Sequence, residues 1–258
     1  MEKDDFGNRM KEYERKYTNT RIPVSDTLCV RIDGKRFSKF TKGFKKPFDD
    51  HLMQSMVDTT GFLVKETNAD IGYTSSDEIT LMWSKRSEKQ SEHIFSGKIS
   101  KINSILASMA AAAFNYYIAK HAPITYAGKG LAFFDCRAWG VPTLGEASNA
   151  LLWRIQDCRK NSVSCLYRWT AGHARMKDKS QEEMIEDLEK NYNVCWDELK
   201  YYYKYGTIFK HNLVDVETEH GIVSRRKIDT YDPYFFSEVY SFEERINFIN
   251  KIERTKNV

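Results

Sequence analysis

The order of strand-like and helix-like segments between residues 27 and 139 constrains the fold of this chain more than any other feature. Residues 27–33 alternate apolar Leu28, Val30 and Ile32 with Cys29 and Arg31, which is typical of a strand with one buried face. The order is a strand (27–33), a helix (about 50–65, capped by Asp49 or Asp50), a hairpin (71–83), a helix (about 98–120) and a strand (130–139). This β-α-β-β-α-β order predicts an α+β fold of ferredoxin type, an antiparallel sheet with two helices on one face.

The second half of the chain has a different pattern. Residues 144–169 are predicted to be helical with a break near Asn161 and Ser162, and residues 179–192 form a charged helix. A β-hairpin with arms 206–214 and 221–227 follows, and then an amphipathic helix over 242–254. We therefore expect two regions: a catalytic domain of residues 1–140, and a helical and hairpin extension of residues 141–258 packed on it.

Two acidic turns lie at strand ends in the first region. Asp33 and Gly34 end the first strand, and Ser76, Asp77 and Glu78 form the tip of the hairpin. Each alone is typical of an ordinary turn. In a ferredoxin-type sheet, however, the first and third strands are neighbours, so the two turns can meet.

Convergence of these turns would suit a pair of divalent cations. Magnesium prefers one or two carboxylates together with backbone carbonyls, water and phosphate oxygens. Asp33, the Gly34 carbonyl and Asp77 would form such a set, with Glu78 nearby for the second ion or for orientation. Polymerase palms and nucleotide cyclases hold two metals on a sheet of this type, which makes the predicted domain palm-like.

Basic residues lie beside the predicted metal site. Six of them and no acid fall between Lys35 and Lys46, a pattern that fits a solvated loop or a binding site for a triphosphate or nucleic acid. Arg31 and Arg137 are unusual in strands unless they are paired. A phosphate, or an acid other than Asp135 on the same strand, could satisfy Arg137.

Composition excludes several other classes. The five cysteines form no CxxC pair, which argues against a zinc site or a disulfide framework. The charged N-terminus does not resemble a signal peptide, and no uninterrupted apolar run approaches the roughly 20 residues of a membrane span. Walker, GxGxxG and GxSxG motifs are also absent. We expect a cytoplasmic protein with no membrane partner.

A series of short stretches resembles the tRNA-His guanylyltransferases and their relatives, the guanylyltransferase-like 3′–5′ polymerases. The similar stretches are residues 30–37, 45–49, 76–78, 134–137 and 153–162, with later matches at 179–185 and 205–207. They occur in the same order over nearly the whole chain. The resemblance implies a palm-like domain with a helical and hairpin extension.

The resemblance also implies residue roles. Asp33 and Asp77 would hold two Mg²⁺ ions, with Gly34 contributing its carbonyl and Glu78 assisting. The residues implied in nucleotide or RNA contacts are Lys46 and Ser76 for the triphosphate, Arg31, Lys101, Arg137 and Lys179 for phosphates of nucleotide or tRNA, and Asn161 in the helix motif.

The implied reaction adds nucleotides to the 5′ end of tRNA. A 5′-monophosphate attacks ATP and becomes adenylylated, and the 3′-hydroxyl of an incoming GTP or other nucleoside triphosphate then displaces AMP. The resemblance further implies a homo-tetramer.

One stretch indicates a branch within the family. Eukaryotic tRNA-His enzymes carry His-Ile-Asn-Asn-Leu-Tyr-Asn where this chain has Arg-Lys-Asn-Ser-Val-Ser-Cys at residues 159–165. The latter is similar to the bacterial and archaeal branch, which is associated with template-directed repair of 5′-truncated tRNAs. Repair and addition of G to tRNA-His therefore both remain open here.

Two further functions are compatible with the same sheet. A palm-fold nucleotide cyclase would use the two-metal site without RNA, but it would leave the motifs after residue 150 unexplained. A non-catalytic RNA-binding module would have no need of clustered carboxylates beside phosphate-binding lysines.

Overall fold

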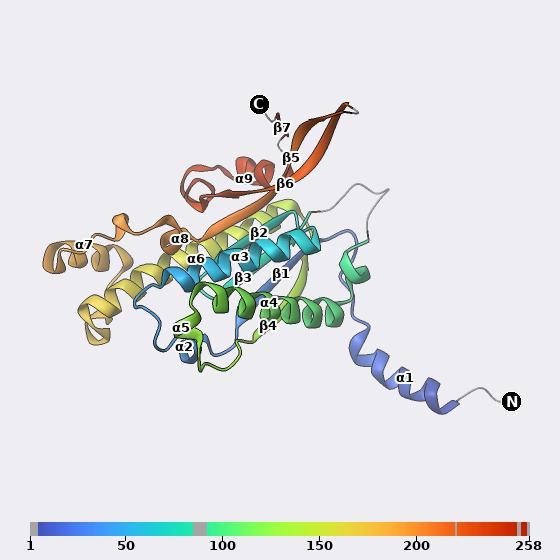
Figure 1. The fold of residues 1–258 in the computed structure, drawn as a ribbon, viewed down its shortest axis with the longest axis horizontal. Coiled ribbons are helices and arrows are strands. Elements are labelled where there is room, and N and C mark those ends of the chain that lie inside the picture. Colours follow the sequence, from blue (N-terminus) through green and yellow to red (C-terminus); the bar gives the residue numbers. More distant parts are fainter. Residues whose placement is uncertain (1–4, 85–91, 220, 252–253, 257–258) are drawn as a thin grey trace.

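The core of the molecule is a mixed α+β structure built on one seven-stranded sheet. The computed structural model describes residues 5–84, 92–219, 221–251 and 254–256. The strands are β1 (Thr27–Gly34), β2 (Ile71–Ser75), β3 (Glu78–Trp83), β4 (Phe134–Val141), β5 (Thr207–Thr218), β6 (Gly221–Tyr231) and β7 (Arg254–Lys256). Their order is β4-β1-β3-β2-β5-β6, with β7 also paired to β5. The first four strands have the predicted ferredoxin-type arrangement, with β1 and β3 adjacent (Figure 1).

Two long helices cover one face of this sheet. They are α3 (Asp50–Thr67) and α4 (Ile99–His121), which lie side by side over the strands (Figure 1). Alternate residues of β1 (Leu28, Val30 and Ile32) are fully buried against them in one apolar cluster. By length and composition α4 could cross a membrane, but it packs its buried side chains in this cluster as a core helix does.

The opposite face is covered by helices from the second half of the chain. The longest is α6 (Leu144–Ala171), and α7 (Gln181–Tyr192) and α9 (Phe242–Asn250) pack beside it. The other set of alternate strand residues, including Cys29, Tyr73 and Met82, enters this second cluster. The sheet therefore lies between two apolar layers, one from each half of the chain.

The C-terminal hairpin continues the sheet. Strand β5 pairs antiparallel with β2 over Ile71–Thr74 and then runs on beside β6, so that the far end of the hairpin projects beyond the other strands (Figure 1). The predicted arms were correct in type, but both strands are longer than expected. This pairing joins the second half of the chain to the first through backbone hydrogen bonds.

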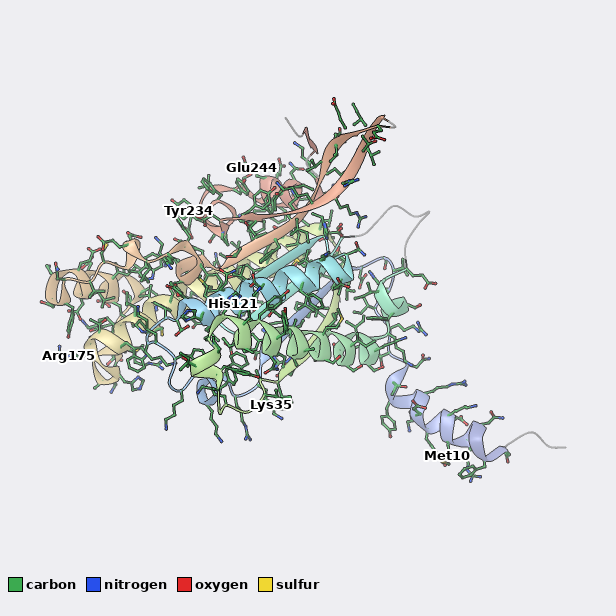
Figure 2. All side chains as sticks on the ribbon, in the orientation of Figure 1. Met10, Lys35, His121, Arg175, Tyr234 and Glu244 are labelled. Atoms are coloured by element: carbon green, nitrogen blue, oxygen red, sulfur yellow. The ribbon has the colours of Figure 1, made fainter. Side chains whose placement is uncertain are left out.

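Shorter helices complete the fold. They are α1 (Asp5–Thr18), α2 (Phe37–Phe40), α5 (Pro123–Tyr126), α8 (Tyr201–Tyr205), the 3-10 turns η1 (Ile94–Gly97), η2 (His173–Met176) and η3 (Trp196–Glu198), and the π-helical turn η4 (Phe235–Val239). The α1 helix buries none of its residues and extends away from the body, as the position of Met10 illustrates (Figure 2).

The predicted break in the long helix is wrong. Helix α6 is continuous through Asn161 and Ser162. Ser162 is buried, donates its hydroxyl to the Arg159 carbonyl and accepts a hydrogen bond from Trp196 Nε1 at 2.9 Å. Because its polar group is satisfied inside the packed helix, this serine does not interrupt it.

Three element boundaries also differ from expectation. Strand β4 begins at Phe134 rather than near residue 130, because the Asn115 side chain binds both the N–H and the C=O of Ala132 and holds that segment against α4. Helix α7 begins after Ser180, which forms a capping box with Glu183. Helix α9 ends at Asn250; the expected helix continued to 254, and its residues 252–253 lie outside the described part of the chain.

Candidate active site

The two acidic turns meet at one end of the sheet. Strand β1 pairs with β3 so that Asp33 lies opposite Glu78, and the Gly34 N–H donates to the Asp77 carbonyl at 3.0 Å. Ser76 turns the chain between β2 and β3 with a φ of 53°, and its hydroxyl donates to Asp77 Oδ1. The backbone itself therefore brings Asp33 and Asp77 together.

Gly34 has a steric reason to be glycine. A Cβ at this position would lie 2.3 Å from the Phe37 ring, which is buried beneath the turn. Phe37 in turn packs against Phe114 and Phe134 with ring centroids 5.3 Å and 5.1 Å away. The aromatic packing beneath the turn thus fixes the position of the Gly34 backbone, including its carbonyl.

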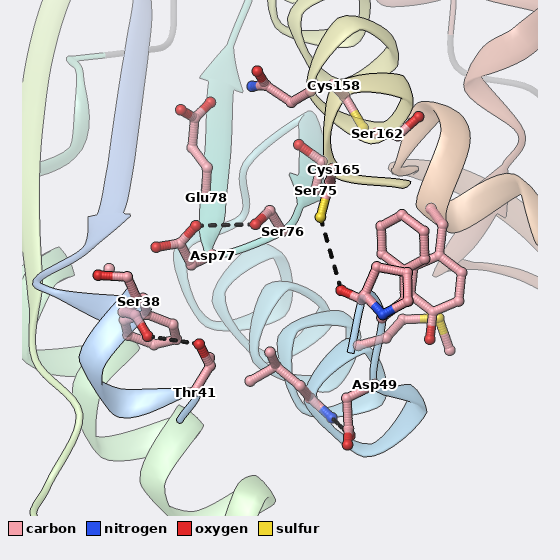
Figure 3. Close-up of a pocket in the computed structure, with 18 of the residues that line it drawn as sticks. Ser38, Thr41, Asp49, Ser75, Ser76, Asp77, Glu78, Cys158, Ser162 and Cys165 are labelled. Atoms are coloured by element: carbon pink, nitrogen blue, oxygen red, sulfur yellow. Dashed lines mark hydrogen bonds between the residues drawn. The ribbon is translucent and has the colours of Figure 1, made fainter. Parts of the chain in front are cut away.

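A pocket of about 720 Å³ opens around these turns (Figure 3). Its walls come from four places: the two acidic turns, the basic loop after β1, the first turn of α3, and helices α6 and α8 of the second half. The predicted site residues that line it are Asp33, Gly34, Lys46, Ser76, Asp77, Glu78 and Asn161. The structure therefore places these seven residues around one cavity.

The basic loop is anchored to the start of α3. Asp49 caps this helix through the N–H groups of His51 and Leu52, and its other oxygen accepts from the Lys45 N–H at 2.9 Å. Lys46 donates its ammonium to Thr41 Oγ1 at 3.2 Å. Of the six basic residues between 35 and 46, the three that line the pocket are Arg36, Lys45 and Lys46.

The pocket has an aromatic wall opposite the acids. Phe48 stacks on Tyr203 with a centroid separation of 4.5 Å, and Tyr202 lies beside them in α8. Asp50, which accepts hydrogen bonds from Lys200 and from the Tyr203 hydroxyl, ties this wall to α3. Such a wall can receive the flat face of a nucleobase.

The acids in the pocket are suited to a cation. Burial and, to a smaller extent, the charge of Asp33 raise the pKa of the Asp77 carboxyl above its ordinary value. A bound cation between the two carboxylates would remove this repulsion. Within the described ranges no three His, Cys, Asp or Glu side chains group to hold a metal alone, so backbone and substrate oxygens would have to complete the shell, as magnesium favours.

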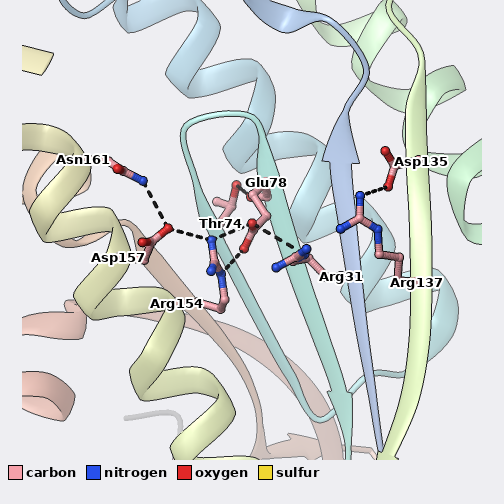
Figure 4. Close-up of polar contacts among 8 residues, drawn as sticks. All are labelled: Arg31, Thr74, Glu78, Asp135, Arg137, Arg154, Asp157 and Asn161. Atoms are coloured by element: carbon pink, nitrogen blue, oxygen red, sulfur yellow. Dashed lines mark hydrogen bonds and ion pairs between the residues drawn. The ribbon is translucent and has the colours of Figure 1, made fainter.

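Glu78 has a different environment from the two aspartates. Arg154 of α6 grips it with two hydrogen bonds, Nε to Oε1 at 2.6 Å and Nη2 to Oε2 at 2.8 Å (Figure 4). Arg154 Nη2 also donates to Asp157 at 3.0 Å, and Asn161 donates to the same carboxylate. Arg31 approaches Glu78 from β1 at 3.8 Å. Glu78 is thus a paired carboxylate at the back of the site.

Four predicted contact residues lie outside the pocket lining. Arg31 stands behind it, next to Glu78 and 5.8 Å from the Trp153 ring. Lys101, in the first turn of α4, lies over the Phe95 ring. Lys179 pairs with Asp187 on α7 at 2.6 Å.

The fourth of these residues, Arg137, corrects a specific expectation. Its guanidinium pairs with Asp135 at 3.2 Å, although the two are on the same strand (Figure 4). The expected partner was a phosphate or another acid, because Asp135 is on the same strand and cannot form a cross-strand pair. Residues two apart on one strand share a face, and a long arginine side chain can bend back to its neighbour.

Several cationic and polar residues of the pocket, among them Arg154 and Asp157, had no predicted role. They recur at helical spacing with the predicted Asn161, beside the apolar positions Leu151 and Ile155, and so mark a polar edge of the buried face of α6. That spacing was a usable signal for Arg154. Arg168 of α6 and Tyr202 carried no comparable signal, because their approach depends on how α6 and α8 pack.

The chain is similar to known proteins in sequence and in fold. The family model described as tRNAHis guanylyltransferase matches residues 7–142. An uncharacterized protein of Acanthamoeba polyphaga mimivirus is 33% identical over 233 residues, covering 83% of this chain and 80% of its own length. A solved bacterial tRNA(His) guanylyltransferase-like protein in complex with ATP has a TM-score of 0.75 and 31% identity, covering 86% of this chain and 92% of that one. A bacterial tRNA(His) guanylyltransferase-like protein in complex with GTP has a TM-score of 0.73 and 28% identity, covering 96% of this chain and 100% of that one.

Proposed function

This chain belongs to the tRNAHis guanylyltransferase family, and from that premise we propose that the pocket at the Gly34 end of β1 is its nucleotidyl-transfer site. The chain is a nucleotidyltransferase that acts at the 5′ end of tRNA in the 3′–5′ direction. The observation that carries the assignment to this pocket is the meeting of Asp33 and Asp77 across a backbone hydrogen bond, inside a cavity lined by cations.

Asp33, Asp77 and the Gly34 carbonyl would hold Mg²⁺, and we propose two ions. When bound, the metal would neutralise charge on phosphoryl oxygens and align the reacting groups. The chain contributes the rigid spacing of its two carboxylates, because their strands are hydrogen-bonded to each other. Both carboxylates already line the same pocket.

The cations around the pocket would bind the triphosphate. Lys46 and Ser76 both line the cavity, and Arg36, Lys45 and Arg168 add positive charge to it. Such groups stabilise the negative charge that develops on phosphoryl oxygens in the transition state. The Phe48–Tyr203 stack would receive the base.

Two displacements would take place here. The 5′-monophosphate of the RNA attacks the α-phosphorus of ATP and releases pyrophosphate, and the 3′-hydroxyl of an incoming nucleotide then attacks the activated 5′-phosphate and releases AMP. The same cationic groups would serve both steps, since both develop charge on phosphoryl oxygens.

Residues outside the cavity would contact the body of the RNA. Arg137 is half exposed, Lys101 is on α4, and Lys179 lies in the segment before α7, all outside the lining of the pocket. We assign them to phosphates of the tRNA, with Arg31 and Asn161 supporting the site from β1 and α6. Loss of such contacts should lower the affinity for RNA and reduce the salt dependence of binding, with a smaller effect on the rates of the two chemical steps.

The RNA preference follows the bacterial branch. The two bacterial guanylyltransferase-like structures are 31% and 28% identical to this chain, and its residues 159–165 carry the Arg-Lys-Asn-Ser version of the α6 motif. We propose template-directed repair of 5′-truncated tRNAs as the main activity. We further propose that the enzyme works in the cytoplasm as a homo-tetramer, for which the exposed apolar side chains of α1 offer a contact surface.

Extension of RNA tests this function directly. Purified protein is incubated with Mg²⁺, ATP, labelled GTP and either tRNA-His or other tRNAs that lack their first nucleotide. We expect extension of the 5′ end that depends on ATP and on the opposite template base. Asp77→Ala should abolish it without loss of folding by circular dichroism. Cyclic nucleotide formed from ATP or GTP alone, with no RNA extension, would contradict the proposal.

A further inference from the structure

The contact between Arg154 and Glu78 joins the two halves of the chain inside the pocket. Both side chains are only 12% exposed, and the guanidinium meets the carboxylate through its Nε–Nη2 edge. This is the bidentate geometry in which arginine binds a carboxylate most strongly. The family model ends at residue 142, so Arg154 comes from the part of the chain beyond it.

The hydrogen bonds of Arg154 indicate what it does not do. Three of its donor contacts go to carboxylates, two to Glu78 and one to Asp157. Both edges of the guanidinium that could hold a phosphate with two parallel bonds include Nη2, which already donates to Glu78 and to Asp157. A two-bond grip of Arg154 on the triphosphate would therefore require one of these carboxylate contacts to break.

Glu78 needs such a partner because of its position. Its Cα faces that of Asp33 across the β1–β3 ladder, and Asp77 precedes it in the chain. An unpaired Glu78 would add a third negative charge beside the two proposed metal ligands and could swing into their place. Paired with Arg154, it leaves Asp33 and Asp77 as the uncompensated carboxylates of the cavity.

We propose that Arg154 is a positioning residue, which neutralises Glu78, holds it out of the metal-binding pair and thereby fixes the geometry of Asp33 and Asp77. This inference rests on the proposed function of the pocket. It also means that α6 is required to complete the acidic site, and that the region matched by the family model is not sufficient for activity.

A double-mutant cycle tests the proposal. The variants are Arg154→Met, Glu78→Gln, the two combined, and Arg154→Lys, with Lys120→Met as the control for loss of a positive charge on an exposed helical position outside the pocket. If Arg154 acts through Glu78, Arg154→Met lowers kcat by about 10- to 100-fold and changes the KM for ATP by less than about threefold. In the Glu78→Gln background the same change should cost less than about threefold.

The conservative variant and the control complete the activity test. Arg154→Lys keeps the charge but loses the fork, so it should recover part of kcat. Lys120→Met should behave as the unmodified protein. A direct contact of Arg154 with nucleotide would instead raise KM, and Arg154→Met would then cost the same factor in the Glu78→Gln background as in the unmodified protein. That result would overturn the proposal.

A stability measurement separates this inference from the proposed function. Urea unfolding of the unmodified protein, Arg154→Met, Glu78→Gln and the double variant gives the coupling between the two residues without any assay of activity. We expect the unfolding constants to show at least about tenfold coupling, with the double variant more stable than Arg154→Met because no buried carboxylate is left unpaired. Additive changes in the free energy of unfolding would refute the pairing. If Arg154 and Glu78 are coupled in unfolding but the protein never extends RNA, only the proposed function of the pocket would be refuted.

Discussion

The two faces of the central sheet are made from alternate residues of the same strands, yet they differ in kind. On the α3–α4 face, Leu28, Val30 and Ile32 are all fully buried and only pack. On the α6 face, Cys29 is buried at one end of β1, Arg31 is partly buried, and Asp33 lies in the pocket at the other end. One face is apolar along its whole length, and the other changes from apolar to charged.

This difference indicates where stability and chemistry are located. The α3–α4 face can be optimised for packing alone, since none of its residues reaches the pocket through β1. The α6 face has to hold charges that burial disfavours, as the raised pKa of Asp77 shows. Neighbouring residues of one strand should therefore respond to mutation in opposite ways.

Asp33→Asn gives the largest expected effect on the chemical face. Loss of one carboxylate from the proposed metal pair should lower kcat/KM for nucleotide addition by on the order of 10²–10³-fold, because a preorganised charge for the transition state is removed. Unfolding in urea should be unchanged or slightly shifted to higher concentration. The matched control is Asp135→Asn. Asp135 lies on β4 directly opposite Asp33 but outside the pocket, so this variant should retain most activity.

Ile32→Ala probes the apolar face one residue away. The side chain is 0% exposed, so its truncation should destabilise the fold by about 2–5 kcal/mol in urea titration. Activity per folded molecule should stay within about threefold of the unmodified protein. Ile124→Ala, at a position 90% exposed, should change stability by less than about 0.5 kcal/mol. A large loss of specific activity in Ile32→Ala would show that the two faces are not separable.

Tyr73→Phe tests the part of the α6 face that packs. Its buried hydroxyl donates to the Tyr205 carbonyl at 2.8 Å and so links β2 to α8. The substitution leaves that carbonyl unsatisfied, which should cost about 1–2 kcal/mol of stability. Tyr116→Phe, on an exposed position of α4, serves as control. Equal denaturant midpoints for the two variants would mean that the link contributes nothing.

Asp187→Asn should give the smallest effect. Hydrogen bonds from Lys179, Tyr167 and Asn191 lower the pKa of the Asp187 carboxyl below its ordinary value. A lowered folded-state pKa contributes stability above the unfolded pKa of about 3.9, and that contribution is lost as pH falls through the folded pKa. The difference in Tm between the two proteins should therefore be largest near pH 6 and narrow as pH falls from about 5 to 3. If the difference in Tm widened as the pH fell, the prediction would be contradicted.

The first half of the site could be predicted from sequence because its geometry is local to one motif. Strand periodicity indicated the faces of β1, and the β-α-β-β-α-β order placed Asp33 beside the turn that carries Asp77. The meeting of Asp33 and Asp77 needed no knowledge of side-chain packing. Their backbone contact follows from the topology of four strands.

The second half of the site depends on packing that no local pattern encodes. Arg154 contacts Glu78 only because of the position in which α6 packs on the sheet. Tyr203 contacts Phe48 only because of the way α8 packs against the first half of the chain. Ser162 looked like a helix break since its partner, Trp196, is 34 residues away. Contacts of this range are decided by tertiary structure.

The ladder between β1 and β3 also sets which insertions and deletions the gene can tolerate. Pairing is continuous from Leu28 with Trp83 to Asp33 with Glu78. Removing one residue from either strand would move every following side chain of that strand to the opposite face. A deletion in β1 before Ile32, for example, would turn Asp33 toward the apolar cluster and Ile32 toward α6. Changes of length in descendants of this chain should therefore accumulate in its connections, while these two strands keep their length.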